Sequence, residues 1–158
     1  MDTNSLLIFF HLIGFGLIMT LLVTGWLLHK QYSSASDYKT KSVILTSARS
    51  VGLISPVAIL VLLITGIGNM EIRGLGFSDE RWLSIKIVLF AIAAVNGILF
   101  GIRSKKRGML VAQLAQGTAE PGAESKLAGM DKATVVFYSV QTILLTSILI
   151  LSVWKPAM

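Results

Sequence analysis

Four long apolar runs set the strongest limit on how this chain can fold. They cover about residues 5–29, 43–68, 82–103 and 134–154. Each has the ~20 residues or more that an α-helix needs to cross the hydrocarbon core of a bilayer. The chain is 14% charged, against about 25% in a typical soluble domain. A water-soluble fold of this size cannot hide so much apolar surface, so we expect an integral membrane protein.

A secretory signal peptide is the alternative interpretation of the first run. It is longer than the usual apolar core of a signal, and no basic residue precedes it. We therefore expect it to be a transmembrane helix. Short connections favour antiparallel neighbours, so residues 1–158 are predicted to form a single all-α domain, an up-down bundle of four membrane-spanning helices.

The distribution of Lys and Arg predicts the orientation of this bundle. Ten of these residues lie in or beside the first and third connections, and four lie on the opposite side. Because positive charge is enriched in cytoplasmic loops, we expect both termini outside, in a multi-pass protein of a cell membrane such as the bacterial inner membrane. The ten are Lys30, Lys39, Lys41, Arg49, Arg103, Lys105, Lys106, Arg107, Lys126 and Lys132; the four are Arg73, Arg81, Lys86 and Lys155.

Composition excludes several classes of function. The chain has no cysteine, which removes disulfides, thiol catalysis and thiolate-bound metals. The basic residues carry neither interleaved aromatics nor a reader motif, so we expect no nucleic-acid partner. The eight acidic residues are expected in the connections or the N-terminus, which argues against a proton-coupled exporter with a buried carboxylate.

Local signals predict four further details of the fold. Pro56 lies inside the second run and is expected to kink that helix. Ser78, followed by two acids, is expected to be the N-cap of the third helix. Residues 117–129 are expected to form a flexible loop, after one or two surface turns at residues 109–114. Asn96 and Gln141 are expected to join two helices by a hydrogen bond.

His11 is the most informative polar residue in the apolar runs. A polar side chain in hydrocarbon is costly, so it marks a function or an interhelical hydrogen bond. A neutral imidazole can ligate haem iron or another metal, and a packing histidine is the equal alternative. Gly14, Gly25 and His29 share its helical face, where the glycines would admit a flat ring or another helix. His29 is expected to be merely interfacial.

Two cations are candidate partners for a ligand. Lys86 is expected near the outer end of the third helix, at about the depth of His11, where it would pair with a carboxylate or extend to the lipid headgroups. Arg49, near the inner end of the second helix, has the same two readings. No residue is assigned a catalytic role.

A group of motifs resembles a known superfamily. The motifs are Ser47-Ala48-Arg49, the stretch from Pro56 to Leu63, Thr65-Gly66, and Trp82-Leu83-x-x-Lys86. Over about residues 5–103 the chain resembles the copper-resistance-protein-D-like superfamily of four-helix membrane proteins, which includes HemJ-type protoporphyrinogen oxidases. The resemblance implies haem b held through His11 and Lys86. The Trp-x-Gly pattern and the Pro-Arg-Leu run of the oxidases are absent.

Three classes of function follow. The first is a haem- or metal-binding membrane protein with a redox role. The second is an accessory subunit of a larger membrane complex, without chemistry of its own. The third is a copper or small-solute transporter, although the six methionines show no MxxM spacing. The expected partners are the lipid bilayer and either further copies of the chain or other membrane subunits.

Overall fold

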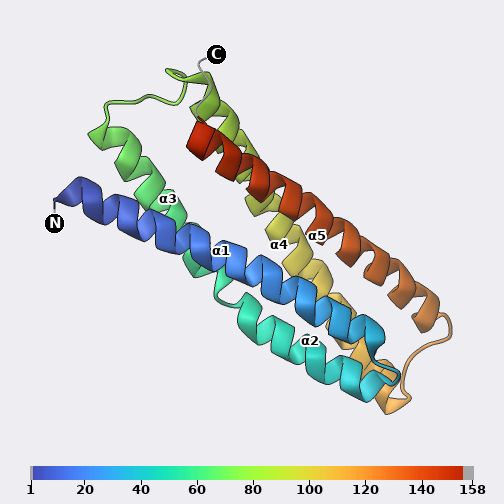
Figure 1. The fold of residues 1–158 in the computed structure, drawn as a ribbon. Coiled ribbons are helices and arrows are strands. Elements are labelled where there is room, and N and C mark those ends of the chain that lie inside the picture. The colour runs from blue at the N-terminus through green and yellow to red at the C-terminus, as the bar shows by residue number, and fades with distance from the viewer. Residues whose placement is uncertain (1, 155–158) are drawn as a thin grey trace.

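The structure, a computed structural model, describes residues 2–154, which fold into helices joined by short connections (Figure 1). The helices are α1 (Thr3–Ser34), α2 (Tyr38–Gly52), α3 (Ser55–Ile72), α4 (Arg81–Gln116) and α5 (Ala123–Trp154). The continuous segment of α2 and α3 provides the second of four apolar spans. The described residues contain no strand, so the predicted all-α membrane bundle is confirmed. Lys155 lies outside the described residues.

The helices extend well beyond the apolar runs. α4 has 36 residues, about 54 Å at 1.5 Å per residue, against ~30 Å of hydrocarbon. The connection between α4 and α5 is limited to residues 117–122, so the loop expected at 117–129 and the separate surface turns at 109–114 are wrong. Residues 109–116 and 123–129 are helical because Val111 and Leu127 bury their side chains with Tyr32 in a small core. We call this end of the bundle, with the connections at 35–37 and 117–122, the basic end.

The kink expected at Pro56 is present as an interruption of two residues between two helices, and both residues keep helical backbone angles. α2 ends at Gly52, and Leu53 and Ile54 form a turn before α3. Pro56 lies in the first turn of α3, where its missing N–H is tolerated. An uninterrupted helix would press the proline ring against the carbonyl of Gly52. After the break α3 follows the N-terminal half of α1, whereas α2 lies beside its C-terminal half and α4 (Figure 1).

The start of α4 differs from the prediction. Glu80 is its N-cap residue, and no side chain caps the helix. The Asp79 carboxylate instead accepts the backbone N–H of Gly76 at 2.5 Å. The N-cap expected at Ser78 is therefore wrong, because the carboxylate beside it closes the preceding turn and the helix begins only at Arg81.

Two glycines on the His11 face of α1 admit neighbouring helices. A Cβ atom at Gly14 would lie 3.1 Å from Leu62 of α3, and one at Gly25 would lie 2.6 Å from the Tyr138 hydroxyl of α5. The close approach expected on this face is therefore made by helices of the same chain. Tyr138 belongs to the main apolar core, with buried residues of α1 and α5 around it.

Candidate functional site

All five helices line a cleft of about 610 Å³. Such a volume lies in the range of small-molecule sites, about 300–1,000 Å³. Most of its lining is apolar: Leu22 of α1, Leu62 of α3, Phe90 of α4 and Leu145 of α5 are examples. On α4 the lining extends from Phe90 to Ala112, about 33 Å of helix. The cleft is therefore long enough for an extended acyl-type chain.

Small residues form the α4 wall of this cleft. Their spacing of three and four residues places them on one helical face. A Cβ atom added at Gly97, Gly101 or Gly108 would meet no atom within 4 Å outside the local helix. These glycines are therefore not needed for contact with another helix of this chain. Because they have no side chains, they widen the cleft along α4. The whole set is Ala93, Ala94, Gly97, Gly101, Ser104, Gly108 and Ala112.

Cations lie on the part of the cleft wall toward the basic end. Arg49 comes from the last turn of α2, and Lys105 and Arg107 come from α4. None of the described residues that line the cleft is acidic. In a poorly solvated cleft such a charge pattern attracts an anion. The site thus combines a long apolar wall with a positively charged region.

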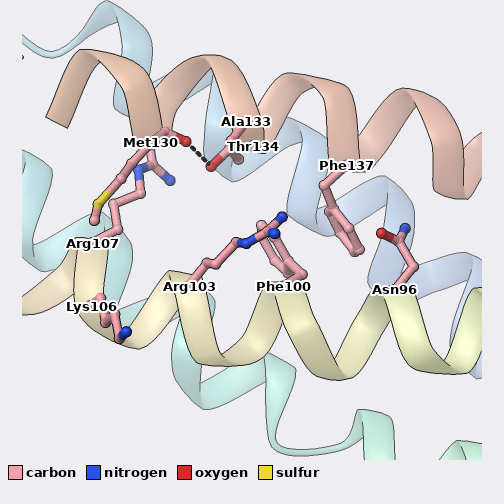
Figure 2. Close-up of a pocket in the computed structure, with 9 residues that line it drawn as sticks. All are labelled: Asn96, Phe100, Arg103, Lys106, Arg107, Met130, Ala133, Thr134 and Phe137. Carbon is pink, nitrogen blue, oxygen red and sulfur yellow. Dashed lines mark hydrogen bonds between the residues drawn. The ribbon is translucent and has the colours of Figure 1, made fainter. Parts of the chain in front are cut away.

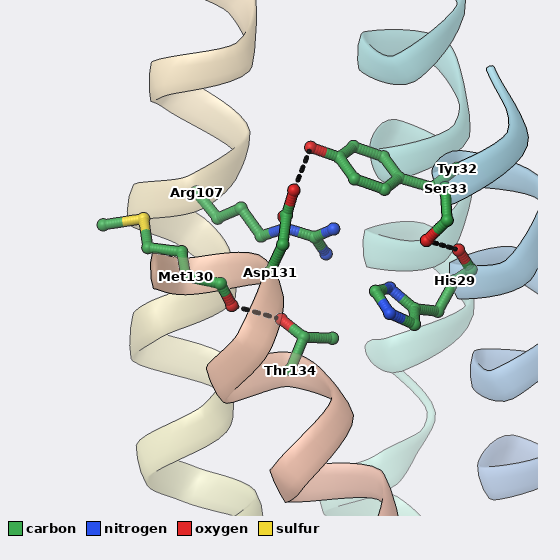
Figure 3. A network of polar contacts seen from close by, with 7 residues as sticks. All are labelled: His29, Tyr32, Ser33, Arg107, Met130, Asp131 and Thr134. Carbon is green, nitrogen blue, oxygen red and sulfur yellow. Dashed lines mark hydrogen bonds and ion pairs between the residues drawn. The ribbon is translucent and has the colours of Figure 1, made fainter. Parts of the chain in front are cut away.

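Arg107 is the centre of a polar network at this region (Figure 3). Its side chain is 4% exposed, and its Nε donates to the Asp131 carboxylate at 2.7 Å. The Tyr32 hydroxyl donates to the other oxygen of that carboxylate at 3.4 Å. The guanidinium carbon also lies 3.9 Å from the centre of the Tyr32 ring, a cation–π contact. The expectation that every acid lies in a connection or the N-terminus is wrong, because Asp131 lies inside α5, where Arg107 neutralises it.

His29 lies next to this network and is buried, with 8% exposure. Its ring stacks on Tyr32 at 6.2 Å between centroids and lies 6.0 Å from the Tyr138 ring. His29 is therefore packed inside the bundle, while its position at the membrane interface stays a prediction from the sequence. Among the described residues, neither His29 Nδ1 nor Arg107 Nη2 has a hydrogen-bond partner, although both atoms are buried. Buried polar groups are normally paired, so these two nitrogens mark a site for a ligand or water.

A second, smaller cavity of about 70 Å³ lies between α4 and α5 (Figure 2). Arg107 lines it as well, together with Arg103 and Thr134. This volume suits one or two waters and is too small for an organic ligand. Nearby, Asn96 donates to Gln141 at 3.0 Å, which confirms the predicted interhelical hydrogen bond.

His11 is held by α3. Its Nδ1 lies 2.8 Å from the Thr65 hydroxyl oxygen, and that hydroxyl lies 2.6 Å from the Val61 carbonyl, to which it donates. Because the single hydroxyl proton is used there, Thr65 must accept from His11 Nδ1–H. The imidazole is therefore the tautomer whose Nε2 carries a lone pair. This donor chemistry fits an axial ligand of haem iron.

The structure separates the predicted site residues into two groups. The Lys86 ammonium lies within electrostatic range of the His11 imidazole. Neither residue lines the cleft or the small cavity, whereas Arg49 lines the cleft. Among residues 2–154 no group of three His, Asp or Glu side chains is placed to hold a metal ion.

No protein-family model, curated protein or solved structure matches this chain. The superfamily resemblance therefore stays a prediction from the sequence. The fold and the cleft define an integral membrane protein of four apolar spans with a mainly apolar internal cleft, which three cations line in part.

Proposed function

We propose that this protein binds an anionic amphipathic molecule of the membrane in the cleft. The observation that carries the proposal is the composition of the cleft wall, which is mainly apolar, includes three cations and has no acid among its described residues. The apolar body of the ligand lies along the small residues of α4. Its acidic head lies toward Arg49, Lys105 and Arg107.

The membrane provides both the ligand and its route into the cleft. Gly97 is half-buried and Gly101 is exposed, so the α4 wall is open to the surface of the bundle. An amphipathic molecule dissolved in the bilayer reaches such a cleft laterally, without crossing water. In the bilayer the chain of the ligand exchanges contact with other lipids for contact with the cleft, so the hydrophobic effect does not drive binding. Affinity comes mainly from close packing and from the charged head.

The experiment fills the cleft and measures ligand binding. Purified protein in a neutral detergent is titrated with dodecyl phosphate, and the complex is measured by native mass spectrometry. Gly97→Leu should weaken binding at least tenfold because the new side chain occupies the cleft. Gly16→Leu is the matched control, since Gly16 is exposed on α1 and a Cβ there meets no atom within 4 Å. Equal binding by the wild type and both variants would contradict the proposal.

The same purification tests whether the protein is an accessory subunit or a homo-oligomer. Gly52 of α2 also faces open space, which would suit a helix from another subunit. A protein that co-purifies at fixed stoichiometry, and that Gly97→Leu releases, would assign the cleft to a partner helix and overturn the ligand proposal.

Haem b at His11 is a second candidate, and the Thr65 hydrogen bond supports it. His11 Nε2 would supply the axial nitrogen, and Lys86 would pair with a propionate. The bound haem would supply one-electron redox chemistry.

The absorption spectrum of the purified protein tests this second candidate. A Soret band should be present in the wild type, absent in His11→Ala and weaker in Lys86→Ala. Gly66→Ala is the control, because its Cβ would make an ordinary 3.5 Å contact with the His11 ring. A Soret band that survives in His11→Ala, or a wild-type protein that stays colourless when expressed with excess haem, would refute haem ligation by His11.

A further inference from the structure

We infer that Arg107 and His29 together form the site that recognises the head of the ligand, and that this head is an oxyanion, a phosphate or a carboxylate. The inference rests on the amphipathic cleft proposed above and assigns its specificity to two side chains. Neither residue was expected to have a role in binding.

Arg107 has donor capacity that its ion pair does not use. The guanidinium has five N–H groups, and the Asp131 carboxylate takes the one on Nε. The residue is 3% exposed, and its Nη2 is buried without a partner among the described residues. A guanidinium this deeply buried needs acceptors for its remaining N–H groups. It lines the cleft, so a ligand oxygen there can accept from Nη2.

His29 offers a second nitrogen at the same place. It is more than nine-tenths buried, it lines the cleft, and its Nδ1 has no partner among the residues described. Figure 3 shows the imidazole and the Arg107 guanidinium pointing toward one another from α1 and α4. The Tyr32 ring and the Tyr138 ring both pack near this imidazole, with centroids 6.2 Å and 6.0 Å from it. With a proton on Nδ1, His29 donates to an oxygen that Arg107 also contacts.

The charges around this site favour an oxyanion over a cation or a neutral head. Both oxygens of the Asp131 carboxylate are already engaged, one by Arg107 and the other by Tyr32. Lys105 and Arg49 line the same cleft and are exposed. An incoming anion therefore meets the positive charges of Lys105 and Arg49, while the Arg107–Asp131 pair contributes N–H donors. Charge-assisted hydrogen bonds of this kind are about twice as strong as neutral ones.

Four probes separate the contributions of head and body. They are dodecyl phosphate, dodecanoate, dodecanol and inorganic phosphate, each titrated into the full-length protein in neutral detergent. The two charged amphiphiles should bind at least tenfold more tightly than dodecanol, and their order identifies the head as phosphate or carboxylate. Tight binding of inorganic phosphate alone would overturn the inference of an amphiphile head group and show a site for the free ion.

Two conservative variants test the side chains. His29→Phe keeps a stacking ring and removes Nδ1, and Arg107→Lys keeps a positive charge near Asp131 and removes Nη2. Each should weaken dodecyl phosphate binding by about tenfold to a hundredfold and leave dodecanol binding unchanged. Arg103→Gln is the matched control, because Arg103 is an exposed cation on α4 that lines the small cavity and not the cleft.

The outcomes distinguish this inference from the proposed function. If Gly97→Leu weakens dodecyl phosphate binding while His29→Phe and Arg107→Lys do not, the cleft binds the ligand but the head-group site is wrong. If Gly97→Leu has no effect, the cleft itself is wrong and the inference fails with it. If Arg107→Lys does not fold, His29→Phe decides, since a phenyl ring preserves the packing against Tyr32.

Discussion

Adding one methyl group at Gly25 should destabilise the bundle measurably. In Gly25→Ala the new Cβ would lie 2.6 Å from the Tyr138 hydroxyl oxygen and 2.8 Å from Cε1 of the same ring. Real Cβ atoms do not approach so closely, so the ring or α1 must shift. Tyr138 is buried, and the Trp26 ring lies 5.2 Å from it, so the ring has little freedom to move. Overpacking of this kind costs about 1–3 kcal/mol.

A second glycine on the same helix isolates that cost. A Cβ at Gly16 would meet no atom within 4 Å. Replacing a helical glycine by alanine gains up to about 1 kcal/mol in helix propensity, and this gain is common to both sites. The difference between Gly25→Ala and Gly16→Ala is therefore the clash alone, about 1–3 kcal/mol. Gly14→Ala, with a 3.1 Å contact to Leu62, should fall between them.

Thermal unfolding in one detergent, followed by circular dichroism, measures the series. The melting temperature should decrease in the order Gly16→Ala, Gly14→Ala, Gly25→Ala, with a shift of roughly 2–4 °C per kcal/mol. If the melting temperature of Gly25→Ala is equal to or higher than that of Gly16→Ala, α1 and α5 do not make this close contact at Tyr138 in the purified protein.

Two further predictions concern the connections and the helix ends beside them. Engineered cysteines at Ser34 and Ser125 should resist an impermeant thiol reagent in intact cells while one at Ser78 reacts, and labelling of the first two would reverse the predicted orientation. Hydrogen bonds from the backbone N–H and hydroxyl of Thr40 hold the pKa of the Asp37 carboxyl below its ordinary value. Its capping of α2 is therefore complete above the ordinary pKa of aspartate and is lost as the pH falls through the lowered value. The Thr40 amide resonance in a pH titration should report that lowered pKa, and an ordinary value there would show that the cap does not form.

Most of the fold was predictable because lipid imposes simple rules on sequence. Apolar runs of sufficient length must become helices, and Pro56 breaks the helix it interrupts. The extensions at the basic end were expected only as short surface turns at 109–114 and a loop, because Val111 stands in a short apolar run and Leu127 stands among charged and small residues. Their helical spacing (Leu110, Val111, Leu114) is a signal that could have found them.

The candidate site was less predictable than the fold. The basic residues of α4 look alike in sequence, and nothing local separates buried Arg107 from exposed Arg103. The distinction arises from Asp131 and Tyr32, which come from two other helices. An acid such as Asp131 near several cations is a signal for an ion pair that buries one of them. This signal was not used, because Asp131 was expected in a connection. Orientation and haem binding at His11 stay predictions from the sequence.

The cleft lies beside the interruption between α2 and α3, where Gly52, Leu53 and Ser55 line it. The role of the α4 glycines as cleft wall could therefore not be interpreted from sequence. Small residues at this spacing predict a close helix–helix contact, and a continuous second helix would have offered α4 a partner along its length. Because the chain turns at Leu53 and Ile54, α3 packs along α1 while α4 packs along α5. The small face of α4 then borders a space instead of a helix, as the empty surroundings of Gly97 and Gly101 show. The small face of α4 thus borders the cleft beside the interruption that precedes Pro56.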